Sequence, residues 1–174
     1  MSATKPYYPR LFFALWPDEA LGRQLTKLNR HIPVASGKPV APQNLHITLQ
    51  FIGTVSAQQY QQLLPLAARC PLPAFTLQLD RLGYFPRPQV LWLGARNPPE
   101  ALGQLVQCLG AAMKQCGLTP DPRPYKPHLT LRRKVSKPVP DFPFDAISWP
   151  VASFALVSSQ TLASGAQYQI LQRW

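Results

Sequence analysis

His46-Ile47-Thr48-Leu49 is a tetrapeptide that returns later in the chain, with one conservative change, as His128-Leu129-Thr130-Leu131. The whole sequence holds three histidines, so the repeat accounts for two of them. The two copies lie about half of the 174 residues apart. This spacing predicts two similar lobes that bring the copies side by side about a pseudo-twofold axis.

Each copy has the pattern of a β-strand with one buried face. Side chains two positions apart point to the same side of a strand, so His46 and Thr48 share one face. Ile47 and Leu49 occupy the opposite, apolar face, and the second copy repeats this arrangement. Each motif therefore presents an imidazole and a hydroxyl together on one surface.

The segments around the motifs predict an α+β protein built on antiparallel sheet. Apolar or alternating runs predict strands, and leucines at three- and four-residue spacing predict helices. The strands at 75–81 and 90–94 are expected to form a hairpin across a proline-containing turn. Strands are predicted at residues 10–16, 45–52, 75–81, 90–94, 128–133, 154–159 and 168–174, and helices at 18–32, 56–70 and 102–113.

The charge of the chain favours a polyanionic partner. Lys and Arg outnumber Asp and Glu by 18 to 7, which gives a net charge of +11. Nucleic acid is the leading candidate, and a positive surface that only keeps the protein soluble is the alternative. The region of the second motif is especially basic, with Arg123, Lys126, Arg132, Arg133, Lys134 and Lys137.

Several common classes of site are disfavoured. Three cysteines without CxxC spacing suggest neither a disulfide framework nor a thiolate metal site, which fits a cytoplasmic location. Acidic residues are few and no histidine pair has helical spacing, so no metal or other cofactor is expected. No signal peptide, membrane span, GxSxG elbow or GxxxxGK loop is apparent.

Two imidazoles that face one substrate suit a reaction that takes one proton from a nucleophile and delivers another to a leaving group. Hydrolysis of a phosphodiester is such a reaction, and threonine hydroxyls can hold the non-bridging phosphate oxygens. One such motif alone is more often structural, but the pair favours catalysis. His31 lacks the pattern and is interpreted as a structural or surface residue.

The motifs and the segments around them resemble the 2H phosphoesterase superfamily, and within it the RNA 2',3'-cyclic phosphodiesterases, also called 2'-5' RNA ligases. The resemblance implies a single two-lobed domain over residues 1–174, in which two antiparallel sheets form a central cleft with helices outside. The segments that carry it are 10–14, 44–53, 92–94 and 127–131, followed by Ser159, Gly165, Tyr168, Leu171 and Trp174.

The same resemblance implies roles for the motif residues. His46 would be the proton donor to the leaving 3'-oxygen and His128 the proton acceptor that activates water, so that the product keeps a 2'-phosphate. Thr48 and Thr130 would hold the phosphate. The family's arginine, five residues after the second histidine, is Arg133.

The position five residues after the first histidine is Phe51, whose ring could stack on a base. Strand alternation puts Arg132 on the active face, so Arg133 reaches the phosphate only across a bulge or at the strand end. Arg132 is therefore kept as the second candidate.

The partner implied by the resemblance is RNA with a 2',3'-cyclic phosphate end, with tRNA fragments among the candidates. One alternative is 2'-5' RNA ligation, the reverse reaction, and another is a noncatalytic RNA-binding module. A monomer that acts without membrane attachment is expected.

Overall fold

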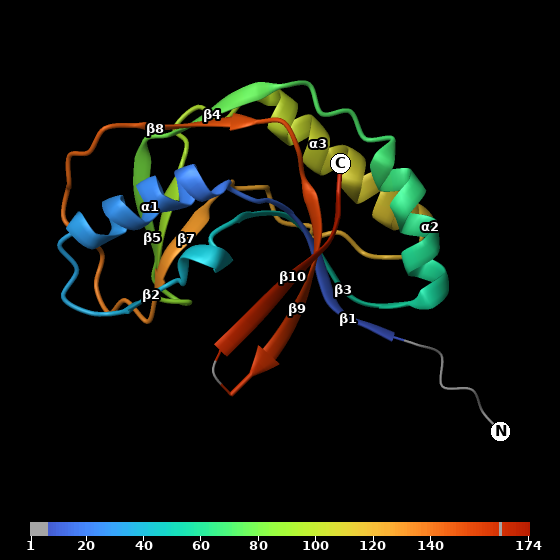
Figure 1. Ribbon diagram of the computed structural model, residues 1–174, viewed down its shortest axis with the longest axis horizontal. Coiled ribbons are helices and arrows are strands. Elements are labelled where there is room, and N and C mark those ends of the chain that lie inside the picture. The colour runs from blue at the N-terminus through green and yellow to red at the C-terminus, as the bar shows by residue number, and fades with distance from the viewer. Residues whose placement is uncertain (1–6, 164) are drawn as a thin grey trace.

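The computed structural model describes residues 7–163 and 165–174, which form strands and helices in a mixed order (Figure 1). The helices are α1 (Glu19–His31), the short 3-10 helix η1 (Pro42–Asn44), α2 (Ala57–Ala68) and α3 (Glu100–Gln115). The strands are β1 (Tyr7–Leu15), β2 (Lys38–Pro39), β3 (Ile47–Ser56), β4 (Phe75–Leu79), β5 (Arg81–Phe85), β6 (Val90–Gly94), β7 (Leu129–Arg133), β8 (Ile147–Val151), β9 (Ala155–Leu162) and β10 (Gly165–Arg173).

The strands form a large antiparallel sheet and a small one. The large sheet has the order β10-β9-β1-β3-β7-β6-β5, with β2 paired to β7, and the small sheet pairs β4 with β8. The two halves of the large sheet meet where Ile47 of β3 lies opposite Leu129 of β7. The predicted α+β class is confirmed, and the two motif-bearing strands are neighbours at the centre of the fold.

Local sequence signals place the first two helices. Asp18 caps α1 by accepting a hydrogen bond of 2.8 Å from the backbone N–H of Leu21. Ser56 and Gln59 form a reciprocal capping box at the start of α2. These caps satisfy backbone donors that would otherwise lack partners at the helix starts.

The predicted hairpin between the strands near residues 75–81 and 90–94 is wrong in its pairing. β6 does form a hairpin, but with β5, so that Gly83 lies opposite Trp92. β4 instead pairs with β8, far away in the sequence. The partner of β6 is instead β5 (Arg81–Phe85), a short strand that begins just after β4 and shows little alternation of apolar and polar residues.

In each half of the large sheet, the motif strand contacts a helix from the other half, as expected for the predicted pseudo-twofold arrangement. Asn29 of α1 donates to the carbonyl of Leu131 in β7, the motif strand of the other half. Gln50 of β3 donates to the carbonyl of Val106 in α3, again across the halves. Each motif strand therefore forms a hydrogen bond with the helix that precedes the other motif in the sequence.

One large cluster of buried apolar side chains extends through both halves of the sheet. Leu25 of α1, Ile47 of β3, Leu109 of α3 and Leu131 of β7 are all fully buried in it. Burial of each such side chain contributes about 1.5–3 kcal/mol to folding, so the strands that carry the motifs are held rigidly. No helix in the described ranges is long and apolar enough to cross a membrane.

The expectation that the cysteines form no disulfide is wrong. Cys70, just after α2, is bonded to Cys108 in α3, with their Cα atoms 5.7 Å apart. Cys116 is a free, buried thiol. The sequence spacing gave no signal for this bond, because it depends on the packing of α2 against α3, which only the tertiary fold produces.

Candidate active site

The pairing of β3 with β7 sets the two motifs crosswise. Ile47 lies opposite Leu129 in an antiparallel register. Continued by one residue in each direction, this register puts His46 across from Thr130 and Thr48 across from His128. The apolar residues between them are fully buried, so the two imidazoles and two hydroxyls share the other face.

The two imidazoles are anchored in the same way. His46 donates from Nδ1 to the carbonyl oxygen of Asn44, and His128 donates from Nδ1 to the carbonyl oxygen of Lys126, both at 2.7 Å. A carbonyl can only accept, so each Nδ1 carries a hydrogen and each neutral ring leaves Nε2 as the acceptor. Both rings therefore keep Nε2 available for proton transfer to or from a bound molecule.

A β-bulge at the fourth residue of each motif, Leu49 and Leu131, reverses the alternation of the strand. In β3 the partner of Ala14 is Thr48 and the partner of Phe13 is Gln50, so one residue is skipped. Gln50, which strict alternation would put beside His46, is buried against α3. Phe51 instead lies on the side of the histidine, with its ring 6.3 Å from that of Phe12.

The bulge in β7 places the two candidate arginines in different surroundings. Trp92 pairs with Thr130 and Leu91 with Arg132, which again skips one residue. Arg132 is turned toward α1, where its guanidinium donates to the side chain and the backbone carbonyl of Asn29 at 2.8 and 3.0 Å. Arg133 is exposed and lines the pocket beside the motifs.

His46 is enclosed by aromatic rings. The indole of Trp16 stacks on it with an interplanar angle of 2°, and the rings of Phe12 and Tyr168 lie 5.0 and 5.1 Å away. Burial lowers the pKa of His46 from 6.5 to about 4, and the positive charge of Arg133 acts in the same direction. The free protein therefore holds this imidazole in its neutral form near pH 7.

His128 has a more open environment. The ring of Phe85 meets it edge-on at 5.1 Å and the ring of Trp92 lies 6.4 Å away. Trp92 also supports Arg81, whose guanidinium lies 5.8 Å from the centre of the indole ring. The two histidines therefore occupy equivalent strand positions in unequal surroundings.

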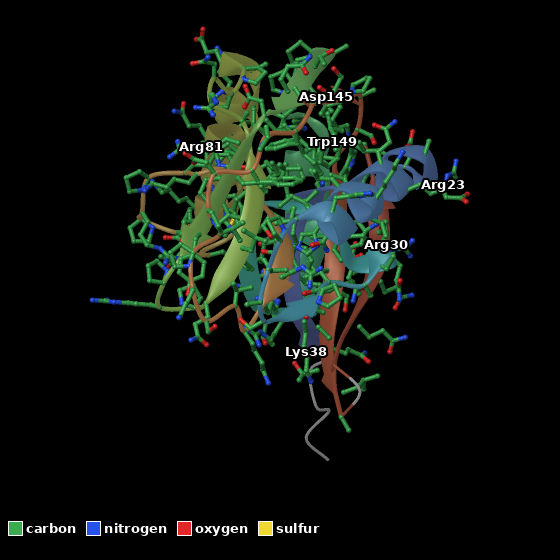
Figure 2. The ribbon with its side chains drawn as sticks, turned by 90° about the vertical axis from the view of Figure 1, so that its left-hand side faces the viewer. Arg23, Arg30, Lys38, Arg81, Asp145 and Trp149 are labelled. Carbon is green, nitrogen blue, oxygen red and sulfur yellow. A yellow bond between two sulfur atoms is a disulfide. The ribbon has the colours of Figure 1, made fainter. Side chains whose placement is uncertain are left out.

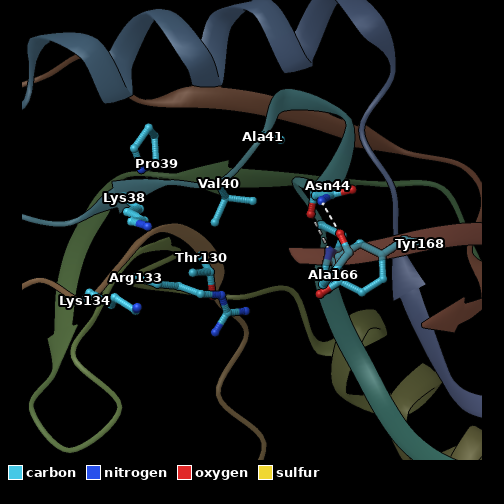
Figure 3. A pocket seen from close by; sticks show the side chains of 11 residues that line it. Lys38, Pro39, Val40, Ala41, Asn44, Thr130, Arg133, Lys134, Ala166 and Tyr168 are labelled. Carbon is cyan, nitrogen blue, oxygen red and sulfur yellow. Dashed lines mark hydrogen bonds between the residues drawn. The ribbon is translucent and has the colours of Figure 1, made fainter. Parts of the chain in front are cut away.

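A pocket of about 240 Å³ opens between the motif strands, β2 and β10 (Figure 3). His46 and Thr130 line it, as the crosswise register requires. Figure 3 shows Lys38 and Lys134 on one side of Thr130 and Asn44 and Tyr168 on the other, with the guanidinium of Arg133 below Thr130 between the two groups. Three cations beside a histidine and a hydroxyl make the pocket suitable for a phosphate group.

The other predicted site residues lie around this pocket and not in its lining. Thr48 is half-buried, and its carbonyl accepts a hydrogen bond of 3.1 Å from the hydroxyl of Tyr125. His128 is half-buried next to the pocket, close enough for its charge to affect the pKa of His46. The side chain of Phe51 is 59% exposed.

Sequence reasoning missed several residues of the pocket. Lys38 belongs to the two-residue strand β2, too short to leave a pattern, and Asn44 belongs to η1. Trp16 and Tyr168 come from opposite ends of the chain to surround His46. The only sequence signal for Trp16 was an aromatic residue directly after the apolar run of β1. Such a residue does not by itself indicate a ring that stacks on a histidine.

The comparisons with known proteins agree with this geometry. Residues 17–162 match the family model described as the 2'-5' RNA ligase superfamily. The chain belongs to this superfamily. The resemblance to 2H phosphoesterases seen in the sequence is thereby confirmed, and the crosswise His-x-Thr motifs lie within the matched residues of this family member.

Individual relatives cover nearly the whole chain. The RNA 2',3'-cyclic phosphodiesterase of Escherichia coli (strain K12) is 39% identical over 170 residues, which is 95% of each chain. The crystal structure of E. coli LigT in apo form matches with a TM-score of 0.88 and 37% identity, over 97% of this chain and 98% of that one. The structure of E. coli LigT complexed with 3'-AMP matches with a TM-score of 0.86 and 38% identity, over 96% and 97%.

Proposed function

We propose that this protein hydrolyses RNA 2',3'-cyclic phosphate ends and leaves a 2'-phosphate and a 3'-hydroxyl. The observation that carries the proposal is the crosswise pair of motifs, which puts two imidazoles with free Nε2 atoms on one face beside Arg133. A relative with 39% identity bears the name RNA 2',3'-cyclic phosphodiesterase. The LigT complex with 3'-AMP supports a nucleotide-sized ligand for the same fold.

The reaction requires two proton transfers on opposite sides of the phosphorus. His128 accepts a proton from water through Nε2 as the water oxygen bonds to phosphorus. The bond from phosphorus to the 3'-oxygen breaks, and His46 donates a proton from its Nε2 to that oxygen. Thr48, Thr130 and Arg133 hold the non-bridging oxygens, whose negative charge grows in the transition state.

The lowered pKa of His46 adds a condition to this mechanism. The neutral imidazole of His46 carries its one hydrogen on Nδ1 and has none on Nε2 to donate. His46 must therefore gain a proton on Nε2 when the substrate binds. The negative charge of the bound phosphodiester raises the pKa of a neighbouring imidazole, and the hydrogen bond from Nδ1 to the carbonyl of Asn44 also favours the protonated ring. Substrate binding and protonation of His46 are therefore coupled in the proposed reaction.

The direct test uses purified protein and an oligoribonucleotide with a 2',3'-cyclic phosphate end, in the presence of EDTA. We expect full hydrolysis, with phosphate found on the 2'-hydroxyl, because the proposed steps use imidazoles and cations of the chain itself. Chromatography of the product against 2'- and 3'-phosphate standards identifies the position. Activity that disappears in EDTA and returns only with added metal would contradict the mechanism, and a joined 2'-5' product would favour ligation.

Arg133→Ala is expected to lower kcat/KM by about tenfold to a hundredfold, because a hydrogen bond to a charged group is worth roughly 1.5–3 kcal/mol. Arg132→Ala is its matched control, since Arg132 is tied to Asn29 and points away from the pocket. This second variant should lower the melting temperature while retaining most of kcat. The reverse pattern in kinetics and thermal unfolding would assign the phosphate to Arg132.

We also propose that residues 1–174 act as one two-lobed domain and as a monomer, which size-exclusion chromatography with light scattering can measure. A cytoplasmic location stays a prediction. The Cys70–Cys108 disulfide removes the cysteine argument for that location, because such bonds are rare in a reducing compartment.

A further inference from the structure

A second hollow, larger than the catalytic pocket, lies along the exposed side of α1. It has a volume of about 690 Å³ and is lined by α1, by the Trp16–Asp18 segment and by η1. Nothing in the two-histidine mechanism uses it. We name it the α1 groove.

The α1 groove adjoins the catalytic pocket. Pro42 and Gln43 of η1 line the groove, whereas the next residue, Asn44, lines the pocket. Trp16 lines the groove while its indole stacks on His46, which lines the pocket. The two hollows are therefore separated by η1 and by a single pair of stacked rings.

The groove carries unpaired positive charge. Arg23, Lys27 and Arg30 recur at helical spacing on one side of α1, and all three are exposed. The two acids in the lining are already engaged: Glu19 pairs with Arg23, and Asp18 caps the helix. Within residues 7–163 and 165–174, neither Lys27 nor Arg30 forms an ion pair.

The arrangement of these cations continues toward the catalytic pocket. Figure 2 shows Arg23 and Arg30 at α1, with Lys38 farther down the molecule in the same view. Lys38 belongs to the lining of the catalytic pocket. In this view Arg23 and Arg30 of the groove and Lys38 of the pocket therefore lie on the same side of the molecule, one below the other.

We infer that the α1 groove binds the RNA strand on the 5' side of the reacting nucleotide, with Lys27 and Arg30 contacting its backbone phosphates. The inference rests on the proposed function and refines it. A 2',3'-cyclic phosphate occupies the 3' end of its strand, so the rest of the RNA leaves the pocket in the 5' direction only. A groove lined by cations and bordered by an aromatic ring matches a single-stranded polynucleotide.

The basic stretch near the second motif is a weaker candidate for this path. Arg123 is paired with Asp121, and Arg132 is bonded to Asn29. Arg133 and Lys134 belong to the catalytic pocket itself. Lys126 and Lys137 of the same stretch form no ion pair with the described residues, but they line neither hollow. Lys27 and Arg30 are unpaired and line the α1 groove beside the pocket, so the groove is better suited to hold the next phosphates of the strand.

The test compares two substrates in one set of variants. The substrates are 2',3'-cyclic AMP, which has no upstream strand, and a short oligoribonucleotide with a 2',3'-cyclic phosphate end. The test variant is Lys27→Ala/Arg30→Ala, and the matched control is Arg69→Ala/Lys114→Ala. The control removes the same charge from exposed positions on α3 and at the end of α2, outside both hollows.

We expect the test variant to lose roughly tenfold in kcat/KM on the oligoribonucleotide at low salt and less than twofold on cyclic AMP. The salt dependence on the oligoribonucleotide should also weaken, by a slope of about 0.7 for each phosphate contact removed. The control should keep wild-type values on both substrates. Circular dichroism of both variants checks that the fold is retained.

The outcomes separate the two proposals. Wild-type protein that hydrolyses neither substrate refutes the proposed function. Equal losses on both substrates, or no loss on the oligoribonucleotide, overturn the α1 groove as an RNA site while the function stands. An equal loss in the control variant would mean that overall charge, and not this groove, attracts the RNA.

Discussion

His46→Ala and His128→Ala are each expected to lower kcat by about a hundredfold to ten-thousandfold, the usual value of one general acid or base. In the part of the chain that the structure describes, neither Nε2 has a hydrogen-bond partner, and both imidazoles are fixed by a 2.7 Å hydrogen bond from Nδ1 to a backbone carbonyl. Among the described residues, neither ring forms a hydrogen bond with another side chain, so the fold should survive. Steady-state kinetics on 2',3'-cyclic AMP measure the effect.

His31→Ala is the matched control for this experiment. His31 is exposed at the end of α1, and its Nδ1 also lies 2.8 Å from a backbone carbonyl, that of Lys27. The substitution removes an imidazole held in a similar way at a distance from the catalytic pocket, so activity should remain. Full activity in either His46→Ala or His128→Ala would refute the two-histidine mechanism.

The separate roles can be assigned with a substrate whose leaving group needs no proton. A nitrophenyl phosphodiester accepted by the site should partly rescue His46→Ala, because the departing nitrophenolate is already a weak base. His128→Ala should stay inactive, because water still lacks its acceptor. Rescue of the His128 variant instead would reverse the two roles.

The second large effect is expected in the pH dependence of stability. The pKa of His46 is lowered to about 4 in the folded protein, whereas the unfolded chain should show the ordinary value of 6.5. The unfolded state therefore binds the proton first as the pH falls. The stabilisation is fully present above about pH 6.5 and is lost as the pH falls through 4, with a total on the order of 3 kcal/mol.

Urea unfolding of the wild type and of His46→Gln between pH 7 and pH 4 measures this contribution. Glutamine does not titrate, so the wild type should lose on the order of 3 kcal/mol more than the variant over that range. His31→Gln is the control and should follow the wild type. Parallel curves for wild type and His46→Gln would mean that His46 titrates normally and that its aromatic surroundings do not exclude water.

The same residue can be followed by NMR in the folded protein. The ring protons of His46 should titrate near pH 4 in free protein and at a higher pH when inorganic phosphate fills the pocket, because the bound negative charge favours the imidazolium. A pKa that does not move with phosphate would contradict the coupling between binding and protonation on which the proposed role of His46 as proton donor depends.

The sequence alone determined the features that depend on neighbouring residues. The two His-x-Thr motifs, the shared face of His46 and Thr48, and the starts of the first two helices near residues 18 and 56 were all predicted from residue spacing. Strand and helix periodicities are local properties, so one segment is enough to reveal them. The repeat of the motif was also enough to predict the pseudo-twofold relation.

Only the tertiary structure decided the features that depend on the pairing of distant segments. The bulge after Thr130 turns Arg132 to Asn29 and brings Arg133 to the pocket, and no residue type in β7 marks that bulge. The pairing of β4 with β8 and the disulfide between Cys70 and Cys108 likewise join segments far apart in the chain. The strand register, the burial of His46 and the charge around the pocket arise from contacts between such segments. Residue spacing within one segment therefore cannot predict them.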